Sequence, residues 1–142
     1  MAESLKFSVQ LPVYPERVYR AWLDGGEQRK ITGKAARVAG QEGSDFSLLD
    51  NGVEGKILSL TPHDKVVQSW RTPNFPAGSP ASQVELRFEP TCTGTELVLE
   101  HTGIPDGQSQ QMLKLWENEL FRPLQRYFDE IVGEYVADMG DG

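Results

Sequence analysis

The sequence predicts an α+β fold in which a curved antiparallel sheet of about six to seven strands wraps around one long C-terminal helix. Apolar and polar residues alternate near the N-terminus and again over residues 82–89 and 95–102, as they do in half-buried strands. The last third instead repeats its apolar residues every three or four positions, as an amphipathic helix does. This helix is the only expected element long enough to cover the apolar face of such a sheet.

The N-terminal segment predicts one strand followed by two short helices. Over residues 5–11 the apolar side chains share one parity, and Pro12 ends the strand because proline cannot donate a ladder hydrogen bond. Pro15 suits the first position of a helix, and apolar residues then recur at spacings of three and four as far as Leu23. The run 24–26 (Asp-Gly-Gly) ends this helix, and residues 26–31 predict a second one.

The middle of the chain predicts antiparallel strands separated by turns. Asn51 and Gly52 form the strongest hairpin signal, because both tolerate the positive φ of a type I′ turn. Residues 61–64 predict another turn, and three prolines make residues 72–80 an extended loop. The strands themselves are expected at residues 34–39, 45–49, 54–60, 65–71, 82–89 and 95–102.

The C-terminal third predicts one long helix that starts after Asp106, whose side chain is suited to cap it. Pro123 lies inside this helix, where it removes a hydrogen bond to the carbonyl of Glu119, so we expect a kink there. Past Ala137 the tail is expected to fray. We expect one domain over residues 1–142, with its core at about 5–135.

Composition restricts the classes of partner and compartment. The chain has 142 residues with 14 basic and 21 acidic side chains, so its net charge is −7, which disfavours nucleic acid or an anionic membrane as the main partner. Cys92 is the one cysteine, which excludes an internal disulfide. With no signal peptide and no apolar run of about 20 residues, we expect a cytoplasmic protein without a membrane span.

Short motifs distributed over residues 5–132 resemble one known family. The most specific is the segment 66–71 (Val-Val-Gln-Ser-Trp-Arg), and the Pro15 to Trp22 segment and the His101 to Pro105 segment also match. The remaining matches are 31–33, Gly43, 46–48, Gly55, 94–97, Trp116, Phe121, 123–124 and Tyr127. The chain resembles the activator of heat-shock protein 90 ATPase homologue family. This family belongs to the START-like, birch-pollen-allergen-like (SRPBCC) superfamily, whose members share the helix-grip fold.

The resemblance implies a fold and several functions. Eukaryotic family members resemble two-domain co-chaperones whose N-terminal domain carries an Asn-Asn-Trp-His-Trp element. This sequence lacks that element, and we expect it to correspond to the C-terminal domain alone. The wider superfamily includes lipid carriers, plant-ligand binders and polyketide cyclases. A small apolar or aromatic ligand and a heat-shock protein 90 homologue are therefore the expected partners.

The candidate site is a ligand cavity between the sheet and the last helix. A strongly curved sheet gripping a helix often leaves such a space. Plain core packing of the aromatics remains the alternative. The expected lining is Trp22, Phe46, Trp70, His101, Trp116, Leu120 and Tyr127, with Asn74 and Phe75 forming a lid over it.

His101 shares its parity with Leu97 and Leu99, so its imidazole is expected to face inward, either hydrogen-bonded within the core or free to titrate. Arg71 has two interpretations, a fork for a carboxylate ligand or a surface ion pair. With two histidines and no acidic cluster at helical spacing with either, no catalytic metal is expected, and no motif indicates a cofactor.

Three functions are consistent with these features. The first is a non-enzymatic binding module with an apolar cavity. The second is a chaperone-associated interaction protein. The third and least favoured is a cyclase- or hydrolase-like enzyme that uses His101 as acid or base. A filled space beneath the last helix would favour the second.

Overall fold

The computed structural model describes residues 2–140, with side chains described as far as Gly133. The strands are β1 (Glu3–Leu11), β2 (Arg37–Val38), β3 (Asp45–Leu48), β4 (Val53–Thr61), β5 (Lys65–Trp70), β6 (Ser82–Thr91) and β7 (Gly94–Ile104). The helices are α1 (Pro15–Trp22), α2 (Gly25–Thr32), α3 (Ser109–Lys114), the π-helix η1 (Leu115–Phe121) and α4 (Arg122–Gly140). Among the described residues, no helix combines the length and apolar character that crossing a bilayer requires.

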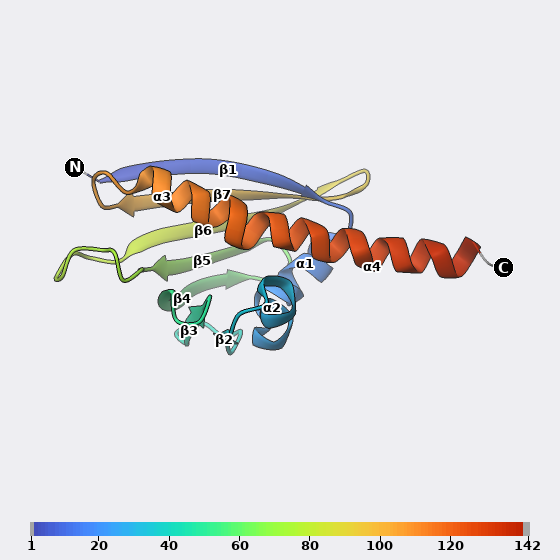
Figure 1. Cartoon of the computed structure of the whole chain (residues 1–142), viewed down its shortest axis with the longest axis horizontal. Coiled ribbons are helices and arrows are strands. Elements are labelled where there is room, and N and C mark those ends of the chain that lie inside the picture. The colour runs from blue at the N-terminus through green and yellow to red at the C-terminus, as the bar shows by residue number, and fades with distance from the viewer. Residues whose placement is uncertain (1, 141–142) are drawn as a thin grey trace.

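The seven strands form one antiparallel sheet in the order β1-β7-β6-β5-β4-β3-β2. The run from α3 through η1 to α4 lies across one face of this sheet, and α1 and α2 lie at one end of it (Figure 1). The predicted α+β helix-grip fold is therefore confirmed, and the two short helices lie where the sequence places them.

The core lies between the sheet and the terminal helix. In β6 and β7 the residues predicted to face inward, including Leu86, Leu99 and His101, are fully buried. From the other side, the terminal helix supplies five side chains that are each no more than 2% exposed: Trp116, Leu120, Phe121, Leu124 and Phe128. Alternation along the strands thus produces one apolar face, as the sequence predicts, although Val98 on the other face of β7 is buried as well.

Two turn predictions are wrong in detail. The hairpin after β3 exists, but it is a four-residue loop in which Leu49, Asp50 and Asn51 adopt positive φ angles of 56°, 56° and 68°, while Gly52 does not. It is therefore not the two-residue type I′ turn. The terminal helix is preceded by Gln108 at the N-cap position and not by Asp106, because Gly107 turns the chain with a φ of 81°.

The predicted kink at Pro123 takes a different form. The widened π-helical turn η1 lies immediately before the proline, and the backbone N–H of Arg122 donates to the carbonyl of Glu117, five residues back. Because Pro123 has no N–H and its ring crowds the carbonyl of Glu119, a wider turn at this point relieves the clash. Helix α4 then continues to Gly140, so residues 138–140, where fraying was predicted, are helical, and residues 141–142 lie outside the described residues.

Candidate functional site

Three tryptophans from different elements meet beneath the terminal helix. Trp116 of η1 stacks on Trp70 of β5 with ring centroids 4.5 Å apart and on Trp22 of α1 at 6.0 Å. Phe46 of β3 packs against Trp70 at 6.0 Å. All four side chains are at most 3% exposed. These rings, which we call the aromatic cluster, contact one another directly.

Gly55 of β4 makes room for the aromatic cluster. It pairs with Phe46 across the β3–β4 ladder and has no side chain to separate that ring from Trp70. A Cβ at Gly55 would lie 2.1 Å from the Ser69 carbonyl oxygen and 2.9 Å from Phe46 Cε1. Such close approach to backbone is the reason that only glycine fits here.

His101 is held within a chain of hydrogen bonds. The indole N–H of Trp116 donates to His101 Nδ1 at 3.0 Å, so the proton of the neutral ring lies on Nε2, which donates to Ser82 Oγ at 2.7 Å. Ser82 in turn donates to the carbonyl of Trp70 at 2.6 Å. Burial lowers the pKa of His101 from 6.5 to about 3. The imidazole is therefore neutral, and both of its nitrogens are hydrogen-bonded within the core, as one of the two alternatives for His101 predicts.

A second polar chain anchors the opposite end of the aromatic cluster. The indole N–H of Trp22 donates to Gln68 Oε1 at 2.8 Å, and the amide of Gln28 donates to the carbonyl of Trp22 at 3.0 Å. Both glutamines are at most 2% exposed. By contrast, the indole N–H of Trp70 is buried and has no acceptor among the described residues.

Tyr127 lies apart from the other predicted lining residues. Its hydroxyl donates to Glu27 Oε2 at 3.0 Å, and Arg17 binds the same carboxylate through both of its terminal nitrogens at 2.9 and 2.6 Å. The Arg17 guanidinium also lies over the Phe128 ring. This group joins α1, α2 and α4 at the end of the sheet. Leu120, in contrast, is buried in the core with the aromatic cluster.

The loop 72–80 is held against the rest of the protein by contacts along its length. Phe75 is 5% exposed and packs under the Arg71 guanidinium, which donates to the carbonyls of Pro76 and Ser79. Asn74 is held through its carbonyl by Gln108. Arg71 thus contacts neutral backbone groups in place of the ion pair that one interpretation predicts. A lid formed by Asn74 and Phe75 stays a prediction.

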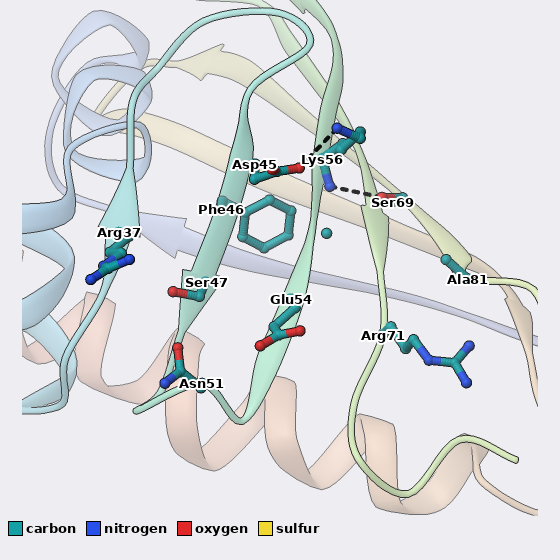
Figure 2. A pocket seen from close by; sticks show the side chains of 11 residues that line it. Arg37, Asp45, Phe46, Ser47, Asn51, Glu54, Lys56, Ser69, Arg71 and Ala81 are labelled. Atoms are coloured by element: carbon teal, nitrogen blue, oxygen red, sulfur yellow. Dashed lines mark hydrogen bonds and ion pairs between the residues drawn. The ribbon is translucent and has the colours of Figure 1, made fainter. Parts of the chain in front are cut away.

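A groove of about 600 Å³ lies on the opposite, outward face of strands β2 to β5 (Figure 2). In β3 and β4 its polar residues alternate with buried core residues, which places them on the face turned away from the aromatic cluster. The strand register aligns Arg37, Ser47, Glu54 and Arg71 in one row across the four strands. The neighbouring row holds Asp45 and Lys56, which form an ion pair at 2.9 Å.

Sequence reasoning missed this groove. Alternation marks its residues as outward-facing, but only the pairing of four strands brings them together. Among the described residues, no group of three or more histidine, cysteine, aspartate or glutamate side chains is placed to hold a metal ion.

Comparison with known proteins identifies relatives of this fold. A family model described as Activator of Hsp90 ATPase homolog 1-like protein matches residues 12–129. The chain is 27% identical over 114 residues to Activator of 90 kDa heat shock protein ATPase homolog 1 from Homo sapiens, covering 80% of this chain and 33% of that protein. An Activator of 90 kDa heat shock protein ATPase homolog from Dictyostelium discoideum is 26% identical over 129 residues, and the match covers 89% of this chain and 33% of that protein. The chain thus spans about one third of the length of these curated relatives.

A solved structure shows the same fold. It is described as an HSP90 activator from Plasmodium falciparum, and it superposes with a TM-score of 0.72 at 22% identity. The match covers 94% of this chain and 96% of that one.

Proposed function

We propose that this chain, which belongs to the family of Activator of Hsp90 ATPase homolog 1-like proteins, is a non-enzymatic interaction domain that binds an Hsp90-class chaperone through its surface. The proposal follows the names of relatives that match 80% of this chain or more. Because the chain spans about one third of those relatives, chaperone binding is proposed for it separately from stimulation of ATP hydrolysis.

The direct stacking of Trp70, Trp116 and Trp22 beneath the terminal helix is the observation that carries this proposal. These rings, which were expected to line a cavity, stack directly on one another, and hydrogen bonds hold them at both ends of the cluster. Binding inside would require the rings to separate, whereas the outward groove already exists. A surface role is therefore favoured over an interior one.

The geometry of His101 supports a non-enzymatic role. Both ring nitrogens have partners, and the lowered pKa leaves the ring neutral near pH 7. A general acid or base needs a pKa near the working pH and access to the reacting atom. His101 has neither, so the cyclase- or hydrolase-like hypothesis loses its candidate residue.

Titration against the purified Hsp90-class chaperone of the same organism tests the proposal. We expect saturable binding by biolayer interferometry, with an unrelated protein of equal net charge as the control. Chaperone ATPase turnover is measured in the same samples. Binding without a change in turnover supports an interaction domain that does not activate by itself. If no binding is measured and turnover stays constant, the proposal is refuted.

An apolar-ligand function is the second candidate, and the buried indole N–H of Trp70 favours it. This donor has no acceptor among the described residues, which leaves it available to a ligand with a polar atom. Native mass spectrometry of the purified protein, followed by chemical-shift titration with lipids and aromatic compounds, tests the idea. A protein without adducts whose spectrum does not respond to the panel excludes it.

A further inference from the structure

We propose that the outward groove on β2 to β5 binds an acidic, extended segment of the partner protein. This inference rests on the proposed function and deepens it, because it names the surface and the chemistry of the partner. Two guanidinium groups, those of Arg37 and Arg71, carry the argument.

Both guanidinium groups lack an ion-pair partner in the part of the chain that the structure describes. Among the described residues, no carboxylate forms an ion pair with Arg37 or with Arg71, although six other ion pairs are present there. The acceptors of Arg71 that the structure describes are two backbone carbonyls and the Ser79 hydroxyl, all of which are neutral. Guanidinium groups with unused donors favour carboxylates, which they bind through two parallel hydrogen bonds.

Arg71 is also held in position before any partner binds. Its three hydrogen bonds to the loop 72–80 and its place over the Phe75 ring, 5.7 Å from the centroid, fix the planar group at one end of the groove. Ordering a free arginine side chain on binding costs free energy, and a side chain that is already ordered avoids most of that cost. Arg37, from the edge strand β2, is exposed and lies at the other end (Figure 2).

The charge of the groove opposes that of the molecule. Lys56 is paired with Asp45, so Arg37, Arg71 and Glu54 remain, and their sum is +1 in a chain whose net charge is −7. An acidic partner is repelled by the molecule as a whole and attracted only where positive charge is left unpaired. Glu54 lies between the two arginines in Figure 2 and restricts the anionic groups of the partner to the two ends.

The dimensions suit an extended peptide. Adjacent strands lie about 4.8 Å apart, so a row across four strands spans about 14 Å. An extended chain rises about 3.3 Å per residue, and about five residues cover this distance. The probe is therefore a labelled eight-residue serine peptide with glutamate at its second and sixth positions, about 13 Å apart on one face of an extended chain, and the same peptide with glutamine in place of glutamate is its control.

Charge variants of opposite sign test the inference by fluorescence anisotropy at low salt. We expect the glutamate peptide to bind and the glutamine peptide not to. Arg37→Gln should weaken binding about threefold, and Glu54→Gln should tighten it by a similar factor. Arg122→Gln and Glu130→Gln on α4 make the same changes in net charge on the other side of the sheet and should leave binding unchanged.

The possible results separate this inference from the proposed function. Equal binding of the two peptides, or equal effects of Arg37→Gln and Arg122→Gln, overturns the groove assignment. A chaperone that binds wild type and Arg37→Gln equally well also overturns it and leaves the proposed function intact. Discrimination between the peptides without any chaperone binding refutes the proposed function and leaves the groove as a site for an acidic segment of another protein.

Discussion

Acidification should destabilise this protein through His101 well above the pH at which carboxylates are protonated. The ring is fully buried, and its Nδ1 accepts a hydrogen bond from Trp116, so a proton added there would set two donors against each other. Burial lowers the pKa of the folded-state imidazole from 6.5 to about 3. At a pH between about 3 and 6.5, the imidazole of the unfolded chain therefore carries a proton that the imidazole of the folded protein does not.

The sign and size of the effect follow from this difference. The contribution of the neutral ring to stability is complete above pH 6.5 and is lost as the pH falls from there toward 3. The loss is about 1.4 kcal/mol per pH unit inside this window, so the free energy of unfolding should fall by about 2 kcal/mol between pH 7 and pH 5. With a urea m-value of about 2 kcal/mol per M, the unfolding midpoint moves by about 1 M.

Urea unfolding of three proteins, followed by tryptophan fluorescence at pH 7 and pH 5, measures this loss. Wild type and His63→Gln, which removes the imidazole in the β4–β5 turn, should both show the loss from His101. His101→Gln should lack it, whatever its stability at pH 7. Nitrogen-15 NMR of the wild-type ring should show a proton on Nε2 and no titration down to pH 4. An equal loss in His101→Gln and wild type, or an imidazole that titrates near pH 6.5, refutes the reasoning.

Three further substitutions test the packing. Gly55→Ala places a methyl group against the Ser69 carbonyl, and thermal unfolding should show a loss of about 1–3 kcal/mol. Gln68→Leu removes the acceptor of the buried Trp22 indole and should cost about 1–3 kcal/mol in urea unfolding, an effect that an unchanged midpoint would contradict. Glu27→Gln breaks the contacts that join α1, α2 and α4, and hydrogen exchange should become faster in α4 while β6 and β7 keep their protection.

Periodicity predicted the order of strands and helices and most of the faces that they bury, but the strand expected at 34–39 is reduced to Arg37–Val38 and the π-helical turn η1 was not predicted. The parity of Leu97, Leu99 and His101 placed the imidazole inside because side-chain direction in a strand is a local property. Turn geometry was less predictable. The Asn51-Gly52 signal gave the position of the hairpin but not its length, because the backbone of Leu49 and Asp50 also enters the left-handed region.

The contacts of the candidate sites could not be predicted in this way. Trp22, Trp70 and Trp116 come from α1, β5 and η1, and their stacking depends on where three elements meet in space. The row from Arg37 to Arg71 depends on the register of four strands, which a single irregular residue changes. Alternation predicts which side chains of a strand face inward, and it does not predict which rings from different elements contact one another.

The stacked tryptophans and the open groove differ in the free energy that a ligand must spend before it can bind. A ligand that enters between Trp70 and Trp116 must first separate rings that stack at 4.5 Å, which forfeits about 0.5–1.5 kcal/mol beyond the lost burial of two large side chains. If the ligand breaks the hydrogen bond between the Trp116 indole and His101, it must offer both groups new partners, because each unsatisfied buried group costs about 1–3 kcal/mol. The groove on β2 to β5 needs no such rearrangement, since its space is present in the free protein, as are two arginines for which the described residues form no ion pair. Binding at the outer face therefore begins with an energetic advantage that an interior ligand has to overcome through its own contacts.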